Sequence, residues 1–150
     1  MPGPPASKIE MKRKLSLLTW ILVLSSLVTG LTQAWMRYLL EPENDFSAWN
    51  HPWQGTVESL HVFLAPILTL LLGYVLAEHA VIHWHNKGTG KGRVRSGGAL
   101  VALICTLILS GAWMAGWSFP EGKLVSWIHG IAGALFGLIF LGHALSRKRG

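Results

Sequence analysis

The sequence is poor in charge. Charged residues make up 13% of its 150 residues, about half of the roughly 25% found in soluble domains, while hydrophobic residues make up 51%. The net charge of +6 would suggest nucleic acid, but the basic residues flank apolar runs instead of lining a polar face. The scarcity of charge therefore argues against a soluble domain, and its distribution argues against a nucleic-acid partner.

Cysteine is equally scarce. It occurs once, at Cys105, in the middle of an apolar run. A single cysteine forms no internal disulfide, and no Cys-x-x-Cys-His motif is present to attach a haem covalently. A c-type cytochrome is therefore excluded, and Cys105 is most simply a small packed side chain.

Four apolar stretches are long enough to cross a bilayer, since a membrane helix needs about 20 mostly apolar residues. Segments with Gly, Pro, Asn and charged residues separate them and favour turns. The first stretch has the basic start of a signal peptide, but its apolar run is long, and we expect it to be retained. The sequence thus predicts a single all-α membrane domain over residues 1–150, a four-transmembrane-helix bundle. Its helices are expected at about 15–39, 57–77, 98–117 and 124–145.

The positions of the basic residues predict how the bundle crosses the membrane. If the N-terminus is cytoplasmic, 11 of the 13 Lys and Arg residues fall on the cytoplasmic side, and only Arg37 and Lys123 fall outside. Basic residues concentrate on the cytoplasmic side of membrane proteins. We therefore expect both the N- and the C-terminus to be cytoplasmic, and the second and fourth spans to run in the same direction.

Histidines occur in only two of the spans, and ionisable side chains inside a membrane are rare and costly. The second span contains His61 and carries His79 at its inner end, 18 residues later; the fourth contains His129 and His143, 14 residues apart. On regular helices these spacings keep each pair within about 40° of one face, with rises of about 27 and 21 Å. Because the two spans are parallel, the outer histidines can face each other, and so can the inner ones.

Facing histidines on neighbouring helices suit the two axial positions of a haem iron, with apolar side chains covering the porphyrin. We therefore predict haem b, in two copies, with each iron held by two histidines. The outer haem is expected on His61 and His129, and the inner haem on His79 and His143. His83, about 40° off the face of His61, is an alternative inner ligand.

Two other interpretations of the histidines remain open. A histidine near a membrane interface is commonly a polar residue at a helix end, and this suits His51 and His85 best. The other interpretation is a transition-metal site on His79, His83 and His85, but no carboxylate or thiolate cluster accompanies these residues.

The pattern resembles a known family. It consists of four spans, a second span that starts near His61 and leads to His79-Ala-Val-Ile-His83-Trp84, and a fourth span with the 14-residue spacing of His129 and His143. Over about residues 15–145 it is similar to the small bacterial di-haem b-type cytochromes, such as the four-helix cytochrome b subunits of membrane-bound hydrogenases and formate dehydrogenases. The 18-residue spacing on the second span departs from that family's pattern.

The resemblance implies a function and a place in the cell. It implies a multi-pass subunit of the bacterial inner (cytoplasmic) membrane, in contact with membrane lipid. Such a subunit transfers electrons between quinone or quinol and other redox subunits of a larger complex, often on the periplasmic side. It carries no substrate chemistry of its own.

Three further polar residues fit this interpretation. Arg37, at the outer end of the first span, could pair with haem propionates or extend toward the interface. Glu58 precedes His61 by one turn, and Glu78 precedes His79 directly. We expect both carboxylates to be helix-end residues or partners of histidine Nδ1–H groups.

Two other functions remain as alternatives. A haem-free membrane anchor or assembly subunit would dock a partner through the Trp-rich outer segment Phe46–Trp53. A proton channel or transporter would use Glu78 and the histidines, but four spans without a broken helix suit transport poorly.

Overall fold

The computed structural model describes residues 6–42, 50–80, 91–116 and 123–146, of which 6–9, 79–80, 91–95 and 146 are described by their backbone alone. Within these ranges the chain forms helices and no strand. The elements are α1 (Ala6–Leu39), α2 (Gln54–Val75) with its π-helical continuation η1 (Leu76–Ala80), α4 (Lys91–Gly116) and α5 (Lys123–Ser146). The predicted all-α fold with four long helices is confirmed.

The helices extend beyond the predicted spans. α1 begins at Ala6 instead of about residue 15, and α4 begins at Lys91 instead of about residue 98. Hydropathy marks where an apolar stretch ends, whereas backbone hydrogen bonding continues through good helix formers such as Lys, Arg, Glu and Met. In α1 the Lys14 ammonium lies 2.7 Å from the Glu10 carboxylate, a pairing across one turn that supports this polar extension.

All four helices have the length and the apolar composition that a membrane span requires. The candidate spans are Glu10–Leu39, Gln54–Glu78, Ser96–Gly116 and Lys123–Leu145. Large apolar side chains are exposed on every helix, among them Leu17, Leu70, Leu109 and Leu138. Apolar surface of this extent is unfavourable in water and suits a lipid environment. The fold therefore fits a multi-pass membrane protein.

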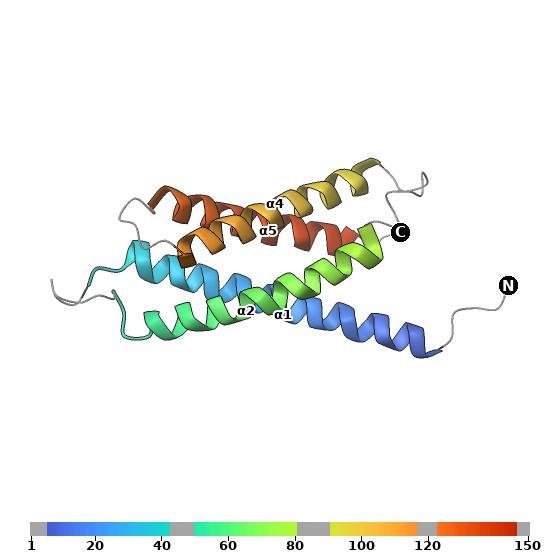
Figure 1. Ribbon diagram of the computed structural model, residues 1–150, viewed down its shortest axis with the longest axis horizontal. Helices are drawn as coiled ribbons and strands as arrows, with labels where there is room; N and C mark the ends of the chain where they lie inside the picture. The colour runs from blue at the N-terminus through green and yellow to red at the C-terminus, as the bar shows by residue number, and fades with distance from the viewer. Residues whose placement is uncertain (1–5, 43–49, 81–90, 117–122, 147–150) are drawn as a thin grey trace.

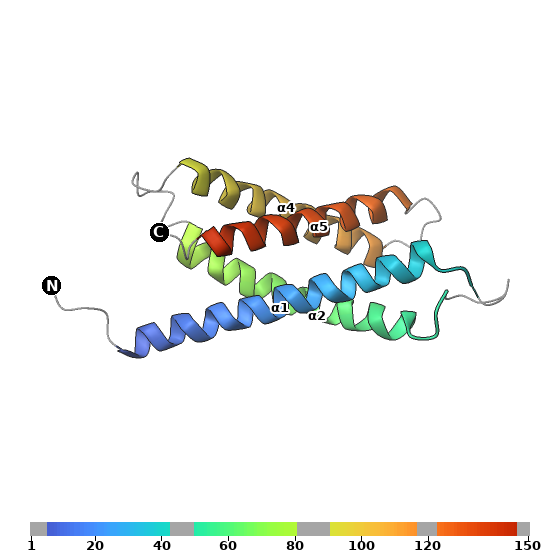
Figure 2. The same ribbon diagram turned by 180° about the vertical axis from the view of Figure 1, so that it is seen from behind.

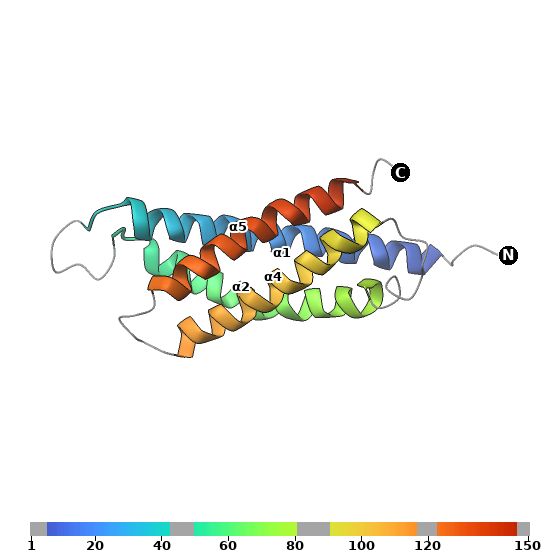
Figure 3. The same ribbon diagram turned by 90° about the horizontal axis from the view of Figure 1, so that it is seen from above.

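The helices form two antiparallel hairpins, α1–α2 and α4–α5, which lie one over the other (Figure 1; Figure 3). The hairpins pack on each other mainly through α1 and α5, which lie one above the other in the foreground of Figure 2 and cross in Figure 3. The start of α1 and the end of α5 lie at the same end of the bundle (Figure 1). As a result α2 and α5, the two histidine-bearing helices, run in the same direction.

The core lies between α1 and α5. The buried apolar side chains of the described residues are Leu22, Val23 and Met36 from α1 and Ala132 and Phe136 from α5. Two aromatic pairs join the same helices: the ring centres of Trp20 and Phe140 are 5.0 Å apart, and those of Tyr38 and Trp127 are 4.8 Å apart. Each such pair contributes about 0.5–1.5 kcal/mol beyond its buried area. The hairpins are thus held together at both ends of the α1–α5 contact.

A glycine allows α1 and α5 to approach between these aromatic pairs. A Cβ atom placed on Gly137 of α5 would lie 2.9 Å from Cδ2 of Leu27 on α1. One at Gly142, one turn further along α5, would meet nothing within 4 Å. A side chain at Gly137 would therefore have to displace the methyl groups of Leu27, whereas glycine leaves them room, as small residues do in membrane helix packing.

This difference predicts the effect of a larger side chain. Gly137→Val should destabilise the bundle by about 1–3 kcal/mol, the usual cost of overpacking. Gly142→Val makes the same change in helix propensity at a position with no neighbour within 4 Å, so it should destabilise the bundle less. Unfolding in detergent, followed by circular dichroism, measures both. Equal losses would mean that Gly137 does not control the α1–α5 approach.

The orientation of the bundle in the membrane remains a prediction from charge. Green fluorescent protein fused after Gly150 should fluoresce, because that end is expected in the cytoplasm. Alkaline phosphatase fused after Glu41, in the predicted outer loop, should be active because it folds outside. The reverse pattern of reporter activities would show that the orientation is inverted.

Candidate functional site

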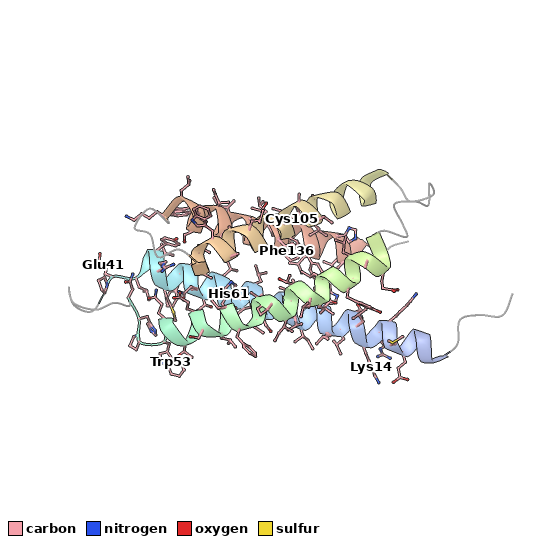
Figure 4. All side chains as sticks on the ribbon, in the orientation of Figure 1. Lys14, Glu41, Trp53, His61, Cys105 and Phe136 are labelled. Carbon is pink, nitrogen blue, oxygen red and sulfur yellow. The ribbon has the colours of Figure 1, made fainter. Side chains whose placement is uncertain are left out.

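The imidazole rings of His61 and His129 meet between the two hairpins. Their centres are 6.3 Å apart, and their planes are nearly perpendicular, at 88°. His61 lies on α2, toward the end of the bundle marked by Glu41 and Trp53 (Figure 4), and both rings are half-buried. The proximity expected from their equal depth on parallel helices is present, while their role as ligands stays a prediction.

Each ring is held through Nδ1 by a hydroxyl from the neighbouring helix of its own hairpin. Thr29 Oγ1 on α1 lies 3.0 Å from His61 Nδ1, and Ser110 Oγ on α4 lies 2.8 Å from His129 Nδ1. Because these bonds occupy Nδ1, the ring nitrogen left to bind a ligand is Nε2 in both histidines.

A glycine follows each hydroxyl residue and lies against the same histidine ring. A Cβ atom on Gly30 would come within 3.0 Å of His61 Cε1, and one on Gly111 within 3.4 Å of His129 Cε1. A side chain at Gly30 would therefore press on the His61 ring, whereas one at Gly111 would make an ordinary contact with the His129 ring. Glycine at these sites lets the ring lie close to the neighbouring backbone.

The two hairpins thus present their histidines in the same way, with a hydroxyl–glycine pair on the first helix and a histidine on the second. Thr29-Gly30 and Ser110-Gly111 were not among the site residues predicted from the sequence. The signal was present: a hydroxyl residue followed by glycine in the interior of each span that precedes a histidine-bearing span.

Glu58 does not partner His61 Nδ1, although this was one of its two expected roles. The Glu58 carboxylate instead accepts a hydrogen bond of 3.0 Å from Gln33 Nε2 on α1. This bond lies in the first turns of α2, so the other expected role, that of a helix-end residue, agrees with the structure. It ties α1 to α2 beside the histidine pair.

The outer ends of α1 and α2 are joined by Asn50. Its side-chain amide donates to the carbonyl oxygens of Arg37, at 3.1 Å, and Leu40, at 2.8 Å, and its backbone N–H donates to Gln54 Oε1, at 2.9 Å. Carbonyls at a helix C-terminus have no partner within the helix, so Asn50 supplies one. The Arg37 side chain itself is exposed.

At the inner end, the third predicted ligand is held in the same manner. His143 Nδ1 lies 2.8 Å from Ser96 Oγ. Ser96 and Ser110 are 14 residues apart on α4, and His129 and His143 are 14 apart on α5. Because the two helices are antiparallel, both hydroxyl–histidine bonds form in register. Unlike Gly111, Gly97 has no side-chain neighbour within 4 Å of a Cβ position.

The expected alignment of His79 with His61 needs correction. That alignment assumed regular α-helical spacing, but His79 lies in the π-helical segment Leu76–Ala80. A π-helix bonds residue i to i+5 and so contains more residues per turn, which rotates His79 away from the calculated face. The side chain of His79 and all of His83 and His85 lie outside the described residues. The alternative inner ligand His83 and the three-histidine metal site therefore stay predictions.

No group of three or more His, Cys, Asp or Glu side chains that could hold a metal ion occurs in the described part of the chain. Comparison of the sequence with protein-family models and with curated proteins, and of the fold with solved structures, finds no match. Function is therefore argued from the histidine pair and its surroundings.

Proposed function

We propose that this protein is a membrane b-type cytochrome subunit that transfers electrons between the quinone pool and a redox partner. The observation that carries the proposal is the His61–His129 ring pair, with its 6.3 Å separation and its two bound Nδ1 atoms. The support comes in three steps: the distance between the rings, the number of protein ligands, and the repeat of the arrangement at the inner end.

The ring separation is too long for a direct hydrogen bond between ring nitrogens; it fits an edge-to-face contact of the two rings and also leaves room for a shared metal ion. A ring nitrogen lies about 1.2 Å from its ring centre, so a direct N–H···N bond of up to about 3.2 Å requires centres within about 5.6 Å. An ion held about 2 Å from each nitrogen allows at most about 6.4 Å, reached when both nitrogens and the ion are collinear. The observed 6.3 Å lies within this limit, so His61 and His129 could together hold the iron of a haem.

The number of ligands favours haem over a bare ion. A bare zinc ion needs three or four protein ligands, and the described residues contain no such group. Haem iron already has four porphyrin nitrogens and needs only two axial ligands. Two histidines from different hairpins, flanked by Gly30 and Gly111, match that need.

The residues of the chain would have defined tasks in this assignment. His61 and His129 would hold the iron, Thr29 and Ser110 would hold the ligand rings, and the apolar side chains of the bundle would exclude water. When bound, haem supplies reversible one-electron chemistry that no side chain of the pair provides.

The inner end supports a second haem. Ser96 and His143 repeat the bond between Ser110 and His129 one 14-residue interval away, a rise of about 21 Å along α5. We propose His143 as one inner ligand; His79 stays the expected second ligand, although its π-helical turn shifts it from the face of His61, and His83 is the alternative. Two haems at these depths span most of the hydrocarbon core, which is about 30 Å thick.

Quinone as one electron carrier, and other redox subunits as partners, follow from the resemblance to the bacterial di-haem b-type cytochromes. The same resemblance supports the bacterial cytoplasmic membrane as the location. The charge distribution supports cytoplasmic termini, so the His61–His129 end faces the periplasm.

Optical spectroscopy tests the outer site. Protein purified from a haem-replete host should be red, with the dithionite-reduced bands of low-spin, bis-histidine haem b. His129→Ala and His61→Ala should each abolish the outer haem, because one imidazole cannot complete six-coordination. His51→Ala removes a histidine at the same end of the bundle and should leave the haem content unchanged. A colourless wild-type protein would overturn the proposal and favour the haem-free anchor.

Haem stoichiometry tests the inner site. His143→Ala should reduce the haem content from two per chain to one and leave the outer haem with its low-spin spectrum. His79→Ala and His83→Ala then identify the second inner ligand, since only one of them should reproduce the loss. One haem per wild-type chain, unaffected by His143→Ala, would limit the protein to the outer site.

A further inference from the structure

The hydroxyls that hold His61 and His129 also donate hydrogen bonds of their own. Thr29 Oγ1 donates to the Ser25 carbonyl at 2.9 Å, and Ser110 Oγ donates to the Thr106 carbonyl at 2.6 Å. Each is a bond to the preceding turn of its own helix. A hydroxyl has one hydrogen, so a hydroxyl that gives it to a carbonyl can only accept from the histidine.

This direction favours one tautomer of both rings. A hydroxyl that gives its hydrogen to the carbonyl accepts from Nδ1–H, which leaves a free lone pair on Nε2 of a neutral ring. Histidine binds a metal through an unprotonated ring nitrogen, and in this tautomer that nitrogen is Nε2. The backbone carbonyls of Ser26 and Leu107 also hydrogen-bond the rings of His61 and His129, respectively, so the hydroxyls act together with these carbonyls.

We propose that Thr29 and Ser110 are positioning residues that keep His61 and His129 in the Nδ1–H tautomer and raise the electron-donating strength of Nε2. Groups that hydrogen-bond the second ring nitrogen of a metal-bound histidine act in this way. A hydroxyl that itself donates to a carbonyl is a stronger acceptor, because hydrogen bonds in a chain polarise one another. The effect on the donor strength of Nε2 toward haem iron rests on the proposed function, whereas the effect on the tautomer is independent of it.

The chain offers matched controls for both hydroxyls. Thr19 on α1 donates to the Leu15 carbonyl at 2.8 Å, and Thr106 on α4 donates to the Ala102 carbonyl at 3.0 Å. These threonines make the same bond to the preceding turn as Thr29 and Ser110. In the described part of the chain, the hydroxyls bonded to His61 and His129 are those of Thr29 and Ser110 and not these two. Replacing Thr19 or Thr106 by Val therefore reports the cost of losing a helix hydroxyl alone.

The first experiment needs no haem. The full-length protein, labelled with ¹⁵N-histidine and prepared without haem in detergent, is studied by NMR at a pH where the rings are neutral. His61 and His129, identified from their alanine variants, should show a protonated Nδ1 and an unprotonated Nε2. Thr29→Val should convert His61 to a mixture of tautomers, and Ser110→Ala should do so for His129, while Thr19→Val and Thr106→Val should change neither. Unchanged tautomers in Thr29→Val and Ser110→Ala would overturn the proposal.

The second experiment measures the effect on bound haem. Thr29→Val and Ser110→Ala should each weaken haem binding at the outer site by about 10–100-fold. They should also raise its midpoint potential, because a weaker donor stabilises oxidised iron less. Thr29→Ser keeps the hydroxyl and should restore both values. A midpoint potential equal to that of the control variants would show a purely structural role. If haem is absent from the wild type but the tautomers behave as expected, the proposed function fails and the positioning role stands.

Discussion

A polar imidazole ring within an apolar bundle must find hydrogen-bond partners in the protein, because the hydrocarbon core of a membrane offers none. In this chain the partner is a hydroxyl on the preceding helix: Thr29 for His61, Ser110 for His129 and Ser96 for His143. The bond sets where each ring lies, which nitrogen remains available, and how the two helices of a hairpin align. Interhelical bonds of this kind contribute about 0.6–2 kcal/mol each in membranes, so they select geometry more than they add stability.

The rest of the fold can be understood as the support for these rings. Glycines beside the hydroxyls let the histidine-bearing helix approach closely, and Gly137 lets α1 approach α5. The core between α1 and α5, together with its aromatic pairs, joins two hairpins that each present a histidine. Because the pair spans the two hairpins, neither hairpin alone contains a complete site. The bundle therefore has to assemble before an ion could be shared between His61 and His129.

Several properties followed from the sequence because they depend on composition along the chain. Length and hydropathy predicted four membrane helices, because both properties are local to each stretch of sequence and do not depend on how the helices pack. The matching depths of His61 and His129 predicted their proximity, because two parallel helices of known register leave little freedom along the membrane normal. Helix starts were less accurate: Ala6 and Lys91 begin their helices well before the apolar stretches, since backbone bonding does not stop where hydropathy falls.

The tertiary structure decided which side chains complete the site. Thr29 and Ser110 look like ordinary helix residues in the sequence, because nothing local shows which face of a helix will meet the next one. The π-helical turn at Leu76–Ala80 was equally hidden, and it changes the face on which His79 lies. The sequence alone determined that four helices are long and apolar enough to cross a bilayer and that two of them carry histidines at matched depth. Only packing determined that a hydroxyl from each hairpin takes Nδ1 and leaves Nε2 for the shared site, because that choice depends on contacts between residues far apart in the chain.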